Sequence, residues 1–310
     1  MSFLNPVNEP VLRFSSTDAG APQINYNSRV AGDVKAVLKA CLVTGYGATA
    51  SAGWTTVNEV DNVCEFVSPS AAMSDYRLGI DDSSASNTIW YYQYQNARVS
   101  PTYNEPVKSI SNITKTSPDN GWQLLVTDRG FYFIEIFYHT SAKNTVARIT
   151  WIGQVKSALL DSTGVNMSYF CMGYQAQVAQ PAQSFDMGTN GALFRFYRLA
   201  SYDRIDFNAT NISAFTTATK VRGVGVADTI SEVFLISAGT AAGVSGNVIG
   251  SQPAMLLHDI NNADDALGVI DKTLDGRQLV QVAVSASTSD ALTLVNYSKS
   301  VMLYLDYWGY

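Results

Sequence analysis

The sequence contains little charge and few residues that carry chemistry. Only 15% of its 310 residues are Asp, Glu, Lys or Arg, against about 25% in an ordinary soluble domain. The formal net charge is −6, and no two Lys or Arg residues are adjacent. Contact with nucleic acid or with an anionic membrane needs clustered positive charge that neutralises phosphates. The composition therefore predicts no nucleic-acid partner and no membrane partner.

Long apolar runs and paired cysteines are also missing. No run of 18 apolar residues occurs, and the opening MSFLNPVNEP has neither a basic nor an apolar segment, so we expect no membrane span, no secretory signal and folding in a cytoplasm. Cys41, Cys64 and Cys171 are an odd number without CxxC spacing, which predicts neither a zinc site nor a redox motif. Cys41 and Cys171 read as buried side chains, and a disulfide between Cys41 and Cys64 is unfavoured in a reducing cytoplasm.

Histidine occurs only as His139 and His258, and neither lies in a recognisable catalytic motif. A G-x-S-x-G sequence is not present, and the nearest run, Gly243 to Gly246, is one residue short. Each histidine is better explained as a side chain at a strand end that bonds to backbone. We therefore predict no catalytic residues, no metal ligands, no cofactor-binding residues, and a protein that is not an enzyme.

Three weaker site hypotheses come from side-chain chemistry. Carboxylates in the acidic stretch 259–275 could supply oxygen ligands to Ca²⁺, but they lack the spacing of an EF-hand, and a solvated loop is preferred. Glu59 with Asp61 could cleave a glycoside, although 26 acidic residues supply such pairs by chance. An aromatic platform for a glycan is the third hypothesis, with a filled β core as its alternative. The calcium set is Asp259, Asn261, Asp264 and Asp265, and the platform set is Trp90, Tyr91, Tyr92, Trp151, Tyr307 and Trp308.

The clearest local pattern is a helix between Asp33 and Gly45. Its apolar residues recur with the spacing of one helix face. Asp33 can cap the first turn, and Gly45 can take the left-handed conformation that ends a helix. The residues of this stripe are Val34, Val37, Leu38, Cys41 and Leu42.

Downstream of this helix the sequence reads as strands and turns, so we predict a mainly β fold: antiparallel, sandwich-like sheets with one short N-terminal α-helix packed on them. We divide the chain into an N-terminal arm at 1–30, a helix plus β domain at 31–180, and a second β subdomain at 181–310. The arm becomes ordered against a neighbouring subunit or lies across its own domain. The expected strands are 63–67, 76–80, 88–94, 122–127, 130–138, 146–152, 193–199, 232–236, 247–249, 278–284, 291–295 and 301–308.

One hairpin is predicted in more detail. Its turn is Asp128-Arg129-Gly130, where Gly130 can supply a positive φ. The second strand, 130–138, is apolar on both faces apart from Glu135. Such a strand is covered on both sides, by a second sheet and the helix or by a partner chain.

Several short motifs occur in order along the chain. STDAGAP spans 16–22, CLVTGYG spans 41–47, and AGWT spans 52–55. They are followed by YRLGIDD at 76–82, WQLLVTDR at 122–129, FYF at 131–133, PAMLLH at 253–258 and Trp308. The set resembles the motifs of a family of tailed-bacteriophage virion structural proteins.

The resemblance implies a non-enzymatic structural component of a tailed-phage virion, which acts through subunit–subunit interfaces in the head, neck, collar or tail attachment. The expected partners are copies of itself and other virion proteins, and the expected location is the virion, assembled in the host bacterial cytoplasm. A low-charge surface with 17 Tyr and 13 Phe suits such contacts. The alternative is a host-glycan-binding tail or fibre module, and a hydrolytic tail enzyme is the third possibility.

Overall fold

The computed structural model consists of antiparallel sheets and, among the residues it describes, one short α-helix near the N-terminus. This architecture confirms the predicted mainly β fold with sandwich-like sheets. The described residues are 7–25, 30–74, 76–83, 88–95, 105–108, 121–139, 144–154, 156–157, 169–172, 195–198, 204–206, 229–236, 248–260, 269–283 and 298–310.

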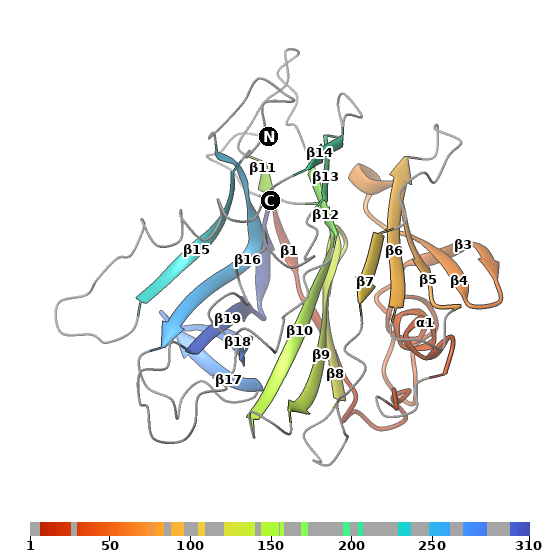
Figure 1. The fold of residues 1–310 in the computed structure, drawn as a ribbon, viewed down its shortest axis with the longest axis horizontal. Helices are drawn as coiled ribbons and strands as arrows, with labels where there is room; N and C mark the ends of the chain where they lie inside the picture. The colour runs from red at the N-terminus through yellow and green to blue at the C-terminus, as the bar shows by residue number, and fades with distance from the viewer. Residues whose placement is uncertain are drawn as a thin grey trace.

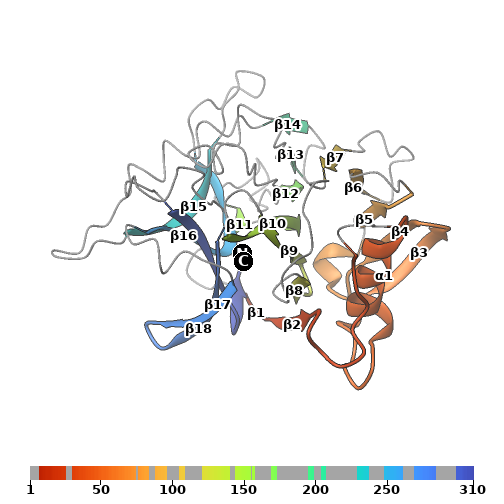
Figure 2. The same ribbon diagram turned by 60° about the horizontal axis from the view of Figure 1, so that its bottom comes forward.

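Three sheets stand side by side as layers (Figures 1 and 2). The central layer has the strand order β10-β9-β8-β2, and all of its pairings are antiparallel. Its core hairpin joins β8 to β9 as the sequence predicted. The strands are β2 (Leu12–Ser15), β8 (Gly121–Thr127), β9 (Gly130–His139) and β10 (Asn144–Gly153).

The first outer layer combines a sheet with the helix. Its strand order, β3-β4-β5-β6-β7, follows the chain. The helix lies beside this sheet, on the side of the central layer (Figures 1 and 2). The elements are α1 (Asp33–Lys39), the π-helical turn η1 (Ala40–Thr44), β3 (Thr55–Val60), β4 (Val63–Val67), the 3₁₀ turn η2 (Ala71–Met73), β5 (Tyr76–Asp81), β6 (Thr88–Gln95) and β7 (Glu105–Lys108).

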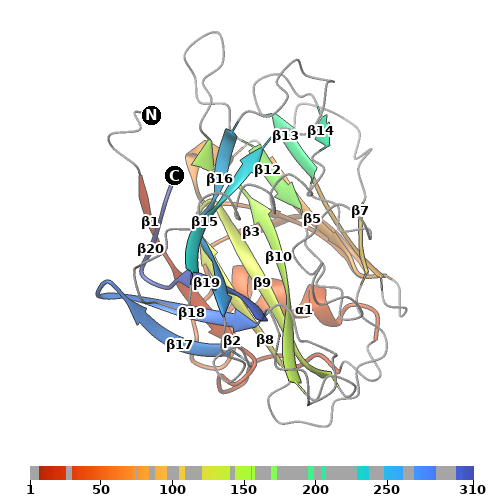
Figure 3. The ribbon, with the colours of Figure 1, turned by 60° about the vertical axis from the view of Figure 1, so that its left-hand side comes forward.

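The second outer layer is a sheet with the order β11-β16-β19-β18-β17, and β15 also pairs with β16. Its β17–β18 hairpin projects from the molecule in Figure 3. Its strands are β11 (Lys156–Ser157), β15 (Thr229–Ile236), β16 (Val248–Ile260), β17 (Val269–Leu274), β18 (Arg277–Ala283) and β19 (Ser298–Tyr304). Two small sheets complete the described fold: β12 (Tyr169–Met172) with β13 (Arg195–Arg198) and β14 (Arg204–Asp206), and β1 (Asn8–Pro10) with β20 (Tyr307–Gly309).

The predicted helical stripe is fully buried in the chain's own core. Its five apolar residues contact side chains of both the central and the five-stranded sheets. The predicted N-terminal cap is wrong, because the Asp82 carboxylate accepts the N–H groups of Val34 (2.8 Å) and Lys35 (3.2 Å). Asp33 instead accepts the N–H of Val30, and Gly32 holds the capping position. Gly45 ends the helix with a positive φ of 74°, but its ψ of 176° is extended rather than left-handed helical.

Over residues 130–136, whose side chains the structure describes, strand β9 is covered on both faces by its own chain, as predicted. Phe131 and Phe133 belong to the core around the helix, and Tyr132 and Ile134 on the opposite face are equally buried. The role predicted for Gly130 is wrong, because its φ is not positive. A Cβ at Gly130 would instead lie 2.6 Å from the carbonyl oxygen of Ile152 on β10, so this position needs glycine for space.

Part of the predicted arm is paired within the chain. Residues 8–10 form β1, which pairs with β20, and residues 12–15 form β2, which pairs with β8. In the described structure, residues 8–10 and 12–15 therefore pair with strands of their own chain. The boundary predicted at 180 and the strand predicted at 291–295 lie outside the described residues. The last predicted strand, 301–308, is divided into β19 and β20, which pair in different sheets.

Candidate functional site

The first two motifs contact one another directly. The Asp18 carboxylate accepts hydrogen bonds from the Tyr46 hydroxyl (2.7 Å) and from the Ser15 N–H (2.9 Å). The backbones of the two motifs are so close that a Cβ at Gly47, where φ is +54°, would overlap the carbonyl oxygen of Ala19. The glycine is therefore required both by conformation and by space.

The third motif binds the end of the helix. The N–H groups of Ala52 and Trp54 donate to the carbonyl oxygens of Cys41 (2.8 Å) and Leu42 (2.9 Å). These bonds satisfy carbonyl groups near the helix C-terminus, where the helix itself offers no partner. The Trp54 ring meets the ring of Phe131 edge-on, with 6.0 Å between centroids. The helix end is thus attached to strand β9 of the central sheet.

Trp122 brings the motif WQLLVTDR to the same place. Its indole N–H donates to the Pro22 carbonyl oxygen (2.9 Å), and its backbone N–H donates to the Ser16 hydroxyl oxygen (3.1 Å). Its ring lies edge-on to Tyr46 at 6.4 Å. Five motifs that are scattered over more than 100 residues therefore meet in one cluster. We name the cluster the motif junction and define it as Asp18, Tyr46, Trp54, Trp122 and Phe131.

The motif junction offers packing rather than reactive groups. Burial, followed by the hydrogen bond to Asp18, raises the pKa of the Tyr46 hydroxyl well above its ordinary value. Burial likewise raises the pKa of the neighbouring Cys41 thiol. Both groups therefore stay protonated at neutral pH, and neither is an activated nucleophile. The junction can fix the path of the chain between the helix and the central sheet.

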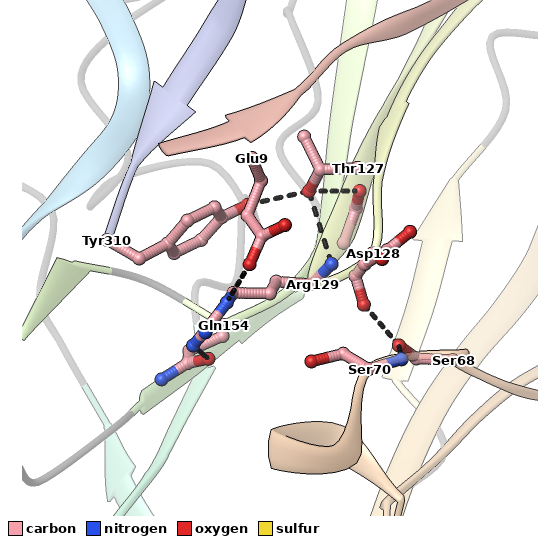
Figure 4. A network of polar contacts seen from close by, with 9 residues as sticks. Glu9, Ser68, Ser70, Thr127, Asp128, Arg129, Gln154 and Tyr310 are labelled. Carbon is pink, nitrogen blue, oxygen red and sulfur yellow. Dashed lines mark hydrogen bonds and ion pairs between the residues drawn. The ribbon is translucent and has the colours of Figure 1, made fainter. Parts of the chain in front are cut away.

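A second polar cluster lies where the ends of the chain meet the β8–β9 turn (Figure 4). The Arg129 Nε donates to the Glu9 carboxylate at 2.9 Å, and its Nη1 donates to the Gln154 side-chain oxygen at 3.0 Å. The guanidinium also lies 5.3 Å from the ring centroid of Tyr310. The Arg129 and Glu9 side chains are only 8% and 14% exposed. We name this cluster the terminal latch: Glu9, Thr127, Arg129, Gln154 and Tyr310.

Hydrogen bonds extend the terminal latch to the five-stranded layer. The Tyr310 hydroxyl shares a hydrogen bond of 2.9 Å with the Thr127 hydroxyl, and burial raises the pKa of Tyr310. The Ser68 hydroxyl, next to β4, donates to the Asp128 carbonyl oxygen in the turn (Figure 4). The latch therefore ties the first strand, the last residue, the central sheet and the five-stranded sheet together.

The two histidines lie on strands of different sheets. His139 is the last residue of β9, opposite Asn144. His258 lies within β16, opposite Ser300, so its predicted place at a strand end is wrong. The two strands belong to different sheets, and the histidine side chains lie outside the part of the structure that is described.

The structure bears on both carboxylate hypotheses, the glycoside-cleaving pair and the calcium site. Ion pairs with Lys39 and Lys35 lower the pKa of Glu59, whereas a glycosidase general acid needs a raised pKa. In the acidic stretch, residues 269–274 form β17 rather than a loop, and Asp271 pairs with Arg13 at 2.9 Å. Among the described residues no group of three metal-ligating side chains is found. The calcium candidates at 261–265 lie outside the described residues.

The aromatic platform loses two of its residues to the core. Trp151 and Trp308 are buried and pack with Tyr132, at 4.4 and 5.1 Å between ring centroids. Tyr307 is exposed and lies 4.0 Å from the guanidinium of Arg277. The platform candidates at 90–92 lie in β6, and their side chains are outside the description.

The predicted burial of Cys41 is confirmed. Cys41 and Cys64 are buried and free, with no disulfide between them. Burial raises the pKa of Cys64 to about 11. The Cys171 side chain is outside the description. No helix among the described residues is both long enough and apolar enough to cross a membrane.

The sequence patterns did not single out the terminal latch. Glu9 and Arg129 are 120 positions apart, and Arg129 ends the motif WQLLVTDR whereas Glu9 belongs to no motif. The available signal was an arginine in a tight turn between two apolar strands, where a buried charge requires a partner. No family model matches the chain, and neither a curated protein nor a solved structure is significantly similar to it.

Proposed function

We propose that the chain is a non-enzymatic structural subunit of a tailed-bacteriophage virion, and that it acts through contacts with copies of itself and with other virion proteins. The observation that carries this proposal is the motif junction. Five of the motifs that resemble virion proteins meet there, and their residues serve as packing surfaces, turn glycines and backbone hydrogen-bond partners.

The chemistry of the junction favours a structural role over catalysis. Residues that define a catalytic family meet at a cleft, where titratable groups with tuned pKa values face a substrate. In this chain the residues of the motif junction meet in the core around the helix. The Tyr46 hydroxyl and the neighbouring Cys41 thiol both stay in their neutral forms. Proteins that share such residues have a fold in common rather than a chemical reaction.

The terminal latch supports the same proposal. A short two-stranded ribbon outside the main sheets is held in place here. Strand β1 and Tyr310 are fixed by a buried ion pair and by hydrogen bonds to the central sheet. A subunit that presents the same surface to every neighbour benefits from a ribbon that is fixed in this way.

A complementation experiment tests the proposal. An amber codon early in the gene should give lysates with incomplete, non-infectious particles in a non-suppressing host. Supply of the wild-type chain from a plasmid should restore infectivity, and so should the double variant His139→Gln/His258→Gln, because no histidine chemistry is needed. Infectious particles without the chain would contradict the proposal. Complete particles of the double variant that fail to degrade the host envelope would point to an enzyme.

A further inference from the structure

Strand β1 is attached to the rest of the chain by a single residue. It ends at Pro10, β2 begins at Leu12, and only Val11 lies between them. The two strands nevertheless belong to different sheets, because β1 pairs with β20 and β2 pairs with β8. Rotation of the backbone at Val11 can therefore move β1 as a unit without breaking the pairing of β2.

The position of β1 is specific for a strand with an acidic side chain. In this position β1 pairs with β20 and lies beside the buried guanidinium of Arg129. Glu9 supplies the neutralising carboxylate, and an unpaired charge in this position is costly. The Arg129 guanidinium lacks its carboxylate partner without residues 8–10, whichever copy of the chain supplies them.

The backbone of strand β1 stays extended when the strand separates from β20. Pro10 fixes its own φ and restricts Glu9 before it to extended conformations. Pro10 has no backbone N–H, but the β1–β20 ladder loses no hydrogen bond at this position. Hydrogen bonds flank the ribbon from Val11 to Asp306 and from Tyr310 to Val7. The Pro10–Tyr307 pair between them is therefore a non-hydrogen-bonded pair.

Exposed apolar side chains lie on both sides of this hinge. Leu12, the residue after Val11, is 46% exposed, and Tyr307, which pairs with Pro10, is 39% exposed. They are two of the five large hydrophobic residues that are exposed in the described part of the chain. Leu12 follows Val11 in the chain and Tyr307 pairs with the residue before Val11, so both side chains are available to a contact beside the hinge.

We infer that β1 is exchanged between two copies of the chain, so that Glu9 of one copy pairs with Arg129 of its neighbour. The inference rests on the proposed function, because it names a contact between neighbouring subunits. Exchange reproduces every contact of β1, so the closed and exchanged forms differ mainly in the hinge and in the new surface that is buried beside it. Burial of Leu12 and Tyr307 between the copies favours the exchanged form.

The short hinge fixes the geometry of the pair. Each Pro10 lies two residues from its own Leu12, and a residue spans at most about 3.5 Å. The Leu12 Cα atoms of the two copies therefore lie within about 14 Å of one another. The exchanged pair places the two Leu12 side chains at a shared interface.

A mixed cross-linking experiment tests the exchange. Asn8 and Gly309 are opposite one another in a non-hydrogen-bonded pair, where Cα atoms are about 4.5 Å apart and a disulfide can form. One full-length chain carries only Asn8→Cys and the other only Gly309→Cys, both with Cys171→Ser. Co-expression in the infected host should give particles that contain a disulfide-linked dimer of the two different chains, which neither variant gives alone.

The double variant Asn8→Cys/Gly309→Cys in one chain is the positive control for geometry. The pair Pro10→Cys and Tyr307→Cys repeats the test if that control does not fold. Particles that contain the chain, cross-link within the double variant and yield no mixed dimer would overturn the exchange and leave the proposed function standing. A cross-link from Asn8→Cys to a different virion protein would also overturn it. Particles that lack the chain would overturn both proposals.

Discussion

Glu9 and Arg129 form an ion pair of 2.9 Å across 120 residues of sequence, and their side chains are almost completely buried. Withdrawal of two charges from water offsets most of their mutual attraction, so such a pair adds little net stability. Loss of one partner is different, because it leaves the other charge buried and alone. The pair therefore determines the position of β1, because only a carboxylate neutralises the buried guanidinium of Arg129.

The first prediction concerns this pair. Glu9→Gln should lower the free energy of unfolding by about 3 kcal/mol, because Arg129 then remains buried without a counter-charge. The matched control is Asp271→Asn, which removes the partner of Arg13 at a position that is 63% exposed and should lower it by less than about 1 kcal/mol. Urea unfolding of both variants measures the difference. Equal effects would contradict the assignment of the latch as a buried pair.

Two glycines provide a second matched comparison. Gly47 and Gly53 both have a positive φ, but a Cβ at Gly47 would overlap Ala19 whereas a Cβ at Gly53 would meet nothing within 4 Å. Gly53→Ala should therefore cost only the conformational term, about 1–2 kcal/mol. Gly47→Ala should cost at least about 2 kcal/mol more, since the first two motifs must separate. Similar melting temperatures for the two variants would show that the motifs do not need this close approach.

The helix stripe gives the third prediction. Leu38 is fully buried in the core, so Leu38→Ala should cost about 2–5 kcal/mol. Lys39→Ala removes a half-exposed ion pair with Glu59 and should cost less than about 1 kcal/mol. Thermal unfolding of the isolated chain measures both effects. If Leu38→Ala left the melting temperature unchanged and blocked only incorporation into particles, the stripe would be an interface instead of core.

Local patterns were enough to predict the helix stripe and the β8–β9 hairpin, because both depend on neighbours in sequence. The Asp82 cap, 48 positions from the helix start, could not be predicted from spacing. Strands β1 and β2 were missed because their partners, β20 and β8, lie far along the chain. The terminal latch was not predicted either, because its residues are also far apart in the sequence. The motif junction was visible in sequence as separate motifs, and only the fold brings them together.

Thiol chemistry supplies the fourth prediction. Burial raises the pKa of Cys41 and of Cys64, so neither thiol should react with a charged disulfide reagent at pH 8 in the folded protein. After denaturation, three thiols should titrate. Mass spectrometry of the labelled peptides identifies each site. A single titrated thiol in the denatured chain would reveal a disulfide.

The fifth prediction concerns pH. Lys39 and Lys35 lower the pKa of Glu59 below its ordinary value of 4.5. Its stabilising contribution is therefore complete above pH 4.5 and is lost as the pH falls through the lower pKa of the folded state. The stability difference between wild type and Glu59→Gln should shrink between pH 5 and pH 3 in urea unfolding. A difference that stays constant over this range would mean that the ion pairs do not form.

The central claim is that the chain is a component of the particle, and its abundance there is the most direct test. Purified, genome-filled particles are digested, and peptides of the chain are quantified by mass spectrometry against isotope-labelled standards and against the genome count. The account predicts a fixed number of several copies per genome, recovered with either the separated heads or the separated tails. Less than one copy per genome, or a quantity that falls with each purification step, would contradict it.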